Sequence, residues 1–424
     1  MNKRTPWALV PTLYFAEGVP YVAVMTISLI MYKRLGLSNT DITLYTSWLY
    51  LPWVIKPLWS PFVDMLRSKR WWIVAMQVLI AASLGGVAFT IPGPWWLQGS
   101  LCFFWLMAFS SATHDIAADG FYMLGLDQHE QAYFVGIRST FYRIATIFSS
   151  GVLVGLAGAL QVITRNIRYS WSLVFYLMAG LFIGLWLYHH WILPKPAEDG
   201  MKSTKSVTEI FQEFKQTVVT FFQKPQVWAG LCFMLFYRMP EGLLAKISAL
   251  FLVDAPHNGG LGLSDGEYGL VQGTVGVIGL TLGGILGGIV ASRDGLKKWL
   301  WPMVLAITLP DLVYVYLSYV MPSDLIVINV CVFVEQFGYG FGFSAYMLYL
   351  IYYSQGSHKT SHYALCTAFM ALSMMIPGMF AGALQETVGY QVFFLIVVAA
   401  CSLTYIVTAF LKIDSEFGKK KADE

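Results

Sequence analysis

The sequence predicts an all-α membrane protein with twelve transmembrane helices in two six-helix bundles. Composition, the length of the apolar runs and an internal repeat predict this fold. Hydrophobic residues make up 57% of the 424-residue chain, and the mean hydropathy is +0.60. Only 12% of the residues are charged, against about a quarter in a soluble domain. One soluble core stops growing at about 250–300 residues, so lipid must cover much of this surface. A soluble enzyme and a nucleic-acid-binding protein are excluded as the main function.

Twelve apolar runs are long enough to cross a membrane, which takes about 20 helical residues. The runs are continuous, whereas the strands of a membrane barrel alternate apolar and polar residues. The first run is longer than a signal-peptide core and no small-residue cleavage site follows it, so we expect it to remain as a helix. The predicted spans are 8–32, 42–66, 71–92, 96–125, 130–162, 169–193, 226–253, 265–291, 297–320, 323–354, 358–388 and 390–412.

The distribution of lysine and arginine predicts the orientation of these spans. Most of these cations lie on the side that carries both termini, which we therefore place in the cytoplasm. The opposite side carries only Lys33, Arg34, Arg165 and Arg168. A long polar stretch separates six helices from six. It divides the chain into an N-terminal bundle, a cytoplasmic linker with a possible amphipathic helix, and a C-terminal bundle. These predicted domains are 1–193, 194–225 and 226–424.

Short motifs recur at equivalent places in the two halves. Glu17-Gly18 in the first span matches Glu241-Gly242 in the seventh, and each half follows with a Gly-Leu-Ser tripeptide. A Tyr-Met-Leu tripeptide occurs in both the fourth and the tenth spans. Duplication of a six-helix unit resembles the organisation of major facilitator transporters, in which the substrate path lies between the halves. Separately, Gly283, Gly284, Gly287 and Gly288 form two overlapping G-x-x-x-G pairs, which predict close helix packing.

Charged side chains inside the predicted spans are the candidate functional residues. A charge at the bilayer centre costs about 2.5–3.5 kcal/mol on insertion scales, so these groups must pair or face a wet cavity. Asp115 and Asp119 share one helix face, with His114 beside them. Two carboxylates this close disfavour joint ionisation, which suits a proton carrier. The alternative is a structural ion pair with Arg138 or Arg143 on the next helix. The other intramembrane charges are Glu17, Lys56, Asp64, Arg238, Glu241, Lys246, Asp311 and Glu335.

Three cations within the spans favour an anionic cargo. Arg143, Arg238 and Lys246 would suit a carboxylate, which an arginine can hold through two hydrogen bonds. Tyrosines next to the charged positions could stack on sugar faces or hydrogen-bond hydroxyl groups. These tyrosines are Tyr14, Tyr142, Tyr237 and Tyr346.

The sequence predicts no metal site, no cofactor and no enzyme activity. Five scattered cysteines form no C-x-x-C pair and are interpreted as packing residues. His358 and His362 are four residues apart, but no carboxylate or thiolate ligand adjoins them, which favours a cytoplasmic loop. The chain contains no nucleophile elbow, zinc-protease motif or P-loop. We therefore expect an ion gradient to supply the energy.

Several segments resemble AmpG-like permeases, which belong to the major facilitator superfamily together with acetyl-CoA transporters. Residues 111–119 are similar to the family segment S-A-S-Q-D-I-V-x-D, and Tyr142-Arg143 matches a Tyr-Arg pair on the fifth helix. Residues 333–335 and the glycines after them resemble the family's tenth helix. Residues 56–64 resemble the family's segment at the entry to the loop between helices 2 and 3. Residues 288–293 resemble a degenerate copy of the major facilitator signature motif.

The resemblance implies proton-driven import of muropeptides for cell-wall recycling across a bacterial inner membrane. We expect a monomeric symporter of GlcNAc-anhydroMurNAc and its peptides that binds lipid but no nucleic acid. The expected proton-coupling residues are Asp115, Asp119, Glu17 and Glu241. The expected substrate-binding residues are Arg143, Lys246, Glu335, Arg238, His114 and Tyr142. The expected conformational latch is Asp64, Arg67, Arg70 and Arg293. The alternatives are a permease for a siderophore or an acyl-CoA-like anion, a membrane-embedded enzyme, or a non-transporting membrane sensor.

Overall fold

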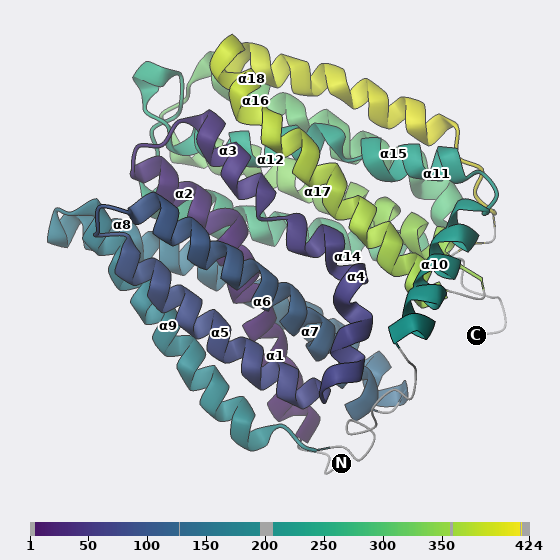
Figure 1. Ribbon diagram of the computed structural model, residues 1–424. Coiled ribbons are helices and arrows are strands. Elements are labelled where there is room, and N and C mark those ends of the chain that lie inside the picture. The colour runs from purple at the N-terminus through teal and green to yellow at the C-terminus, as the bar shows by residue number, and fades with distance from the viewer. Residues whose placement is uncertain (1–4, 127, 196–206, 357–358, 416, 418–424) are drawn as a thin grey trace. The chain divides into compact units, whose positions relative to one another are not determined.

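The computed structural model describes residues 5–126, 128–195, 207–356, 359–415 and 417 (Figure 1). Those residues form helices and connecting loops, and no strand occurs among them. Contacts between the helices divide the chain into two compact units. The first unit is Met1–Gly36 with Ile55–Ser206, and the second is Leu37–Val54 with Val207–Glu424. The predicted domain boundaries at 193 and 226 stay a prediction.

The first unit begins with α1 (Thr5–Val22), which continues through a π-helical turn (Ala23–Ile27) into α2 (Ser28–Arg34). A second π-helical turn (Ile147–Leu153) joins α7 to α8. Such turns often occur at functional sites. The other helices are α4 (Leu51–Leu66), α5 (Lys69–Thr90), α6 (Trp96–Gly125), α7 (Gln128–Thr146), α8 (Val154–Thr164) and α9 (Ile167–Ile192).

The second unit contains α3 together with the helices from α10 onward. Its core is rich in aromatic side chains, with Phe233, Tyr237 and Tyr346 buried against one another. The helices are α3 (Asn39–Trp48), α10 (Val207–Phe222), α11 (Val227–Phe236), α12 (Met239–Val253), α13 (Asp265–Leu270), α14 (Val277–Asp294), α15 (Leu296–Thr308), α16 (Leu312–Val320), α17 (Leu325–Ser354) and α18 (Lys359–Ala409). Short turns of 3₁₀- or π-helix lie at Pro256–Asn258, Val271–Gly276 and Leu309–Asp311.

Within the described ranges, nine helices are long and apolar enough to cross a membrane. The predicted count of twelve is not directly confirmed, and three places account for the difference. The predicted span 42–66 is divided between α3 and α4, and the span 226–253 is divided between α11 and α12 near Arg238. The predicted spans 358–388 and 390–412 share the label α18, but they are two helices that meet at a kink at Gly389, where the backbone is not helical (φ 77°, ψ 165°).

The glycine of each repeated Glu-Gly pair lies where two helices approach closely. A Cβ atom on Gly18 in α1 would lie 2.8 Å from Cβ of Ala145 in α7. A Cβ atom on Gly242 in α12 would lie 2.9 Å from the Ser373 carbonyl oxygen in α18. Real side chains essentially never come so close, and only glycine removes the clash. The repeat therefore marks a packing position in each unit, next to a glutamate that is half-buried in the first unit and buried in the second.

Candidate functional site

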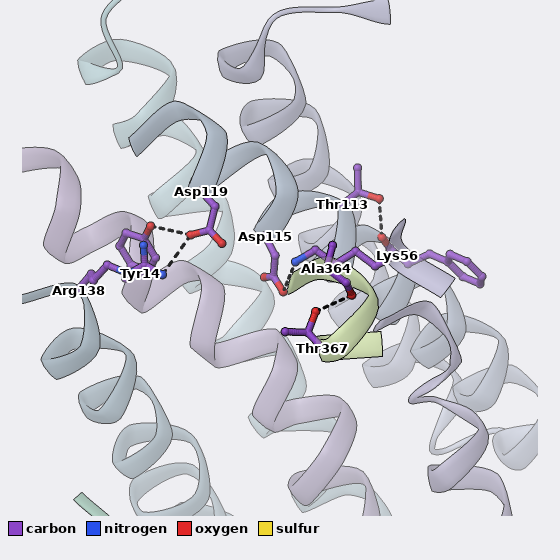
Figure 2. A network of polar contacts seen from close by, with 9 residues as sticks. Tyr14, Lys56, Thr113, Asp115, Asp119, Arg138, Ala364 and Thr367 are labelled. Carbon is purple, nitrogen blue, oxygen red and sulfur yellow. Dashed lines mark hydrogen bonds and ion pairs between the residues drawn. The ribbon is translucent and has the colours of Figure 1, made fainter. Parts of the chain in front are cut away.

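A cluster of charged side chains lies in the first unit, where α1, α6 and α7 meet (Figure 2). The Tyr14 hydroxyl donates a hydrogen bond of 2.8 Å to the Asp119 carboxylate. Nη2 of Arg138 lies 3.3 Å from the same carboxylate oxygen. The Arg138 guanidinium also lies over the Tyr14 ring, 4.6 Å from its centroid. Asp119 thus contacts both the Arg138 guanidinium and the Tyr14 hydroxyl, and the Tyr14 ring also contacts the guanidinium.

Asp115 lies one helical turn before Asp119 and pairs with a different cation. Nζ of Lys56 in α4 lies 3.8 Å from its carboxylate. Glu17 in α1 is close enough to interact electrostatically with both aspartates. Its Oε2 atom is buried and has no hydrogen-bond partner among the described residues. The ion pairs described for this cluster thus join two of its three carboxylates, Asp115 and Asp119, to Lys56 and Arg138.

The structure separates the two arginines that the sequence offered as partners of the aspartates. Arg138 pairs with Asp119, which confirms that alternative for this residue. Arg143 is half-buried and makes no ion pair or hydrogen bond with the residues that the structure describes. The Tyr142 ring packs beside Tyr21, with 6.4 Å between ring centroids. Arg143 thus remains available for a cargo anion.

His114 does not share the environment of its neighbour Asp115. Its side chain is fully buried, and its Nε2 atom lies 3.1 Å from the Gln77 amide nitrogen. The same nitrogen lies 2.9 Å from His189 Nδ1, and His189 Nε2 lies 3.0 Å from the Thr12 hydroxyl. These groups form a polar core that joins α1, α5, α6 and α9. In this conformation His114 has no surface that a cargo could touch.

Two buried cations lie in the second unit without an ion pair to any described carboxylate. The Arg238 guanidinium lies 4.6 Å from the Phe343 ring centroid and donates a hydrogen bond to the Tyr339 hydroxyl. Lys246 donates a 2.6 Å hydrogen bond to the Thr46 hydroxyl. Each side chain is 7% exposed. Aromatic rings and hydroxyl groups therefore stabilise both charges, and Glu241 is close enough to interact electrostatically with Arg238.

Three carboxylates meet in the second unit, away from Lys246. Glu241 in α12, Asp311 before α16 and Glu335 in α17 each offer an oxygen, and these atoms lie within 4.8 Å of one another. All three residues are buried. From the sequence we expected Glu241 in proton coupling and Glu335 in substrate binding, and we expected no role for Asp311. Because the three come from different predicted spans, no spacing in the sequence could have shown that they meet.

The predicted latch residues have different environments. Arg70 joins the start of α5 to the end of α9, because its Nε and Nη2 atoms donate hydrogen bonds to the carbonyl oxygens of Leu193 at 3.0 Å and His190 at 2.6 Å. Arg67 lies over the Trp71 ring at 5.8 Å. Arg293 is exposed in the last turn of α14. The Asp64 side chain and His358 lie outside the described part of the chain.

The comparisons with known proteins agree with this helical fold. The model of the BT1 family matches residues 17–293, which is more than half of the chain. An anhydromuropeptide permease of Escherichia coli (strain K12) is 26% identical over 409 residues, which cover 93% of this chain and 77% of that protein. An AmpG 4 protein of Rickettsia conorii is 25% identical over 397 residues, which cover 90% and 91% of the two chains.

Solved structures of transporters share the fold at low sequence identity. A D-xylose–proton symporter matches with a TM-score of 0.73 and 13% identity, over 98% of this chain and 99% of that one. A POT family transporter in complex with 5-aminolevulinic acid matches with a TM-score of 0.71 and 13% identity, over 96% of each chain. This architecture is the major facilitator fold, as the sequence predicted.

Proposed function

The chain belongs to the BT1 family and is a multi-pass membrane transporter of a small molecule, and we propose that its cargo is an anhydromuropeptide. One observation carries the choice of cargo. Nearly the whole chain is similar to the anhydromuropeptide permease of Escherichia coli. We propose that the chain likewise carries GlcNAc-anhydroMurNAc and its peptides into the cytoplasm, as a monomer in a bacterial inner membrane with both termini on the cytoplasmic side.

We propose that protons drive this import through the carboxylates of the first unit. Glu17, Asp115 and Asp119 outnumber the cations Lys56 and Arg138 by one. An unbalanced charge is costly at membrane depth, so one proton would neutralise the cluster. Glu17 is the expected carrier, because it alone of the three has no ion pair within the described residues and has an oxygen without a hydrogen-bond partner. Release of that proton would leave a negative charge that favours a different conformation.

Cargo recognition is assigned to the cations that no carboxylate neutralises. Arg143 in the first unit, and Arg238 and Lys246 in the second, have no ion pair among the described residues. A peptide carboxylate would supply the missing charge, and an arginine can hold it through two hydrogen bonds. Tyr142 lies next to Arg143 and offers a ring face for the sugar. This arrangement suits a molecule that has both carbohydrate and carboxylate groups.

Uptake by proteoliposomes tests the proposal. The full chain would be reconstituted, and uptake of radiolabelled GlcNAc-anhydroMurNAc-peptide followed with and without an imposed pH gradient. We expect the gradient to drive accumulation and Glu17→Gln to abolish accumulation while counterflow continues. Asp294→Asn is the matched control, because Asp294 is a carboxylate outside the cluster that pairs with Lys298 at 3.2 Å.

Competition identifies the cargo class in the same vesicles. An unlabelled siderophore and an acyl-CoA would each compete with the label if the transporter served those anions. Uptake that ignores the pH gradient contradicts the coupling. Binding without counterflow would instead indicate a non-transporting sensor.

A further inference from the structure

The three clustered carboxylates of the second unit form no ion pair with any cation that the structure describes. Glu241, Asp311 and Glu335 are 7%, 3% and 2% exposed, respectively. Neutral groups donate to two of them. The Gln336 amide donates a 2.9 Å hydrogen bond to Glu335, and the Cys401 thiol lies 3.4 Å from Asp311. Burying charge without a partner is strongly unfavourable, so these carboxyl groups must either carry protons or share a bound cation.

The nearest positively charged side chain is directed elsewhere. Arg238 lies one helical turn before Glu241, but its guanidinium packs on Phe343 and bonds to the Tyr339 hydroxyl. It forms no ion pair with the three acids within the described chain. If all three acids were ionised, Arg238 would still leave two negative charges uncompensated.

A second, independent feature points to a ligand at this place. Tyr314 in α16 is fully buried, and its hydroxyl has no hydrogen-bond partner among the described residues. The hydroxyl lies within reach of the Ser248 hydroxyl and of the Glu335 carboxylate, although it meets full hydrogen-bond geometry with neither. A buried hydroxyl without a partner costs free energy, and its oxygen is a further neutral ligand for a cation. Four oxygen-bearing side chains from α12, α16, α17 and the turn before α16 therefore meet at one point.

We propose that Glu241, Asp311, Glu335 and Tyr314 form a binding site for a hard metal cation of the size of Na⁺ or Ca²⁺. Three oxygens within 4.8 Å of one another surround a point that is about 2.8 Å or less from each in a symmetric arrangement, close to the 2.3–2.6 Å of calcium–oxygen bonds. Mg²⁺ fits less well, because it requires bonds of about 2.0–2.1 Å and gives up its water reluctantly. Carboxylate and hydroxyl oxygens are the ligands that hard cations prefer.

The site deepens the proposed transport function, on which its role as a coupling site rests. It would give the second unit an ion site of its own, in addition to the carboxylates of the first unit. Binding of the ion would hold α12, α16 and α17 together. The ion could leave only when these helices move apart.

Thermal unfolding of the purified full chain tests the site. NaCl, CaCl₂, KCl, MgCl₂ and choline chloride would be titrated at fixed pH and ionic strength, after treatment with a chelator. We expect a saturable rise of the unfolding midpoint with Na⁺ or Ca²⁺ and none with choline, because a ligand that binds only the folded state stabilises it. The cation that acts at the lower concentration identifies the occupant.

Two variants and a control make the test specific. Asp311→Asn keeps the side-chain shape, removes a buried charge and should abolish the response. Tyr314→Phe removes only the unpartnered hydroxyl, so the protein should fold, and the half-saturating concentration should rise about threefold to tenfold. Asp254→Asn removes a buried carboxylate that bonds to Tyr390, outside the site, and should leave the response intact.

Several results would overturn the site. They are an equal rise with choline, a midpoint that depends on pH alone, or a response unchanged in both Asp311→Asn and Tyr314→Phe. Labelled muropeptide uptake would be measured on the same preparations. Normal pH-driven uptake without a cation response would refute the site and leave the proposed function standing. A cation response without uptake would refute the function alone.

Discussion

Replacing two glycines of α14 by alanine should have opposite effects on stability. A Cβ atom on Gly283 would lie 2.0 Å from the backbone oxygen of Phe337 in α17, whereas a Cβ atom on Gly288 would meet nothing within 4 Å. Alanine gains about 0.5–1 kcal/mol over glycine inside a helix. Overpacking of a tight contact typically costs about 1–3 kcal/mol. The clash at Gly283 involves backbone, which cannot rotate away, so we expect Gly283→Ala to destabilise and Gly288→Ala to stabilise.

The two substitutions are matched controls for each other, because both add one methyl group to the same helix. The apparent free energy of unfolding would be measured by titrating the purified protein with SDS. The gain in helix propensity is common to both variants, so we expect a difference equal to the overpacking cost, at least about 1 kcal/mol. Equal stabilities would refute the close approach of α14 and α17. A loss of stability in Gly288→Ala would show that this face is also packed.

Four further substitutions test the charged groups. Arg138→Gln should lower the free energy of unfolding in SDS by roughly 1–2 kcal/mol. This is less than the loss of about 3–5 kcal/mol for a fully buried pair, because both partners are partly exposed. An unchanged free energy of unfolding would contradict the ion pair. Tyr14→Phe should lower the free energy of unfolding by about 1 kcal/mol and slow pH-driven uptake. The uptake rate of Arg138→Lys would be measured beside it for comparison. Lys246→Met should weaken equilibrium binding of labelled cargo without loss of stability, and unchanged affinity would exclude Lys246 from the binding site. Burial lowers the pKa of Lys224, so folding favours its neutral form. The free energy of unfolding should therefore rise as pH rises towards the ordinary lysine pKa. Lys224→Gln should flatten this rise in the free energy of unfolding.

The sequence predicted the helical membrane fold well, because composition and run length depend on the solvent and not on packing details. It predicted only some of the places where long apolar runs break. The boundary predicted between residues 388 and 390 is correct, because two helices meet at a kink at Gly389. Residues 42–66, in contrast, read as one span, yet the chain leaves helical geometry between α3 and α4. Hydropathy is similar on both sides of that second break, so it carries no information on it.

The candidate site, too, could be predicted only in part from the sequence. The spacing of Asp115 and Asp119 correctly placed both on one helix, and Arg138 was one of two offered partners. The partners Lys56 and Tyr14 come from other helices, and only the tertiary fold selects them. His114 shows the converse, because a residue next to Asp115 in the sequence points into a different environment. Neighbours along a helix are separated by about 100°, so adjacency in the sequence was a poor guide to shared function.

Residues 37–54 belong with the second unit, although the helices before and after them lie in the first. Asn39 donates a 2.7 Å hydrogen bond to Gln385, and the Gly382 amide donates one of 3.0 Å to Thr43. A gene divided within residues 196–206 would therefore give two fragments, of which the first carries α3 while α12 and α18, the helices that α3 packs against, are encoded by the second. Co-expression of the two fragments would complete the second unit only if α3 is supplied by the other fragment, which suits α3 to split-protein complementation.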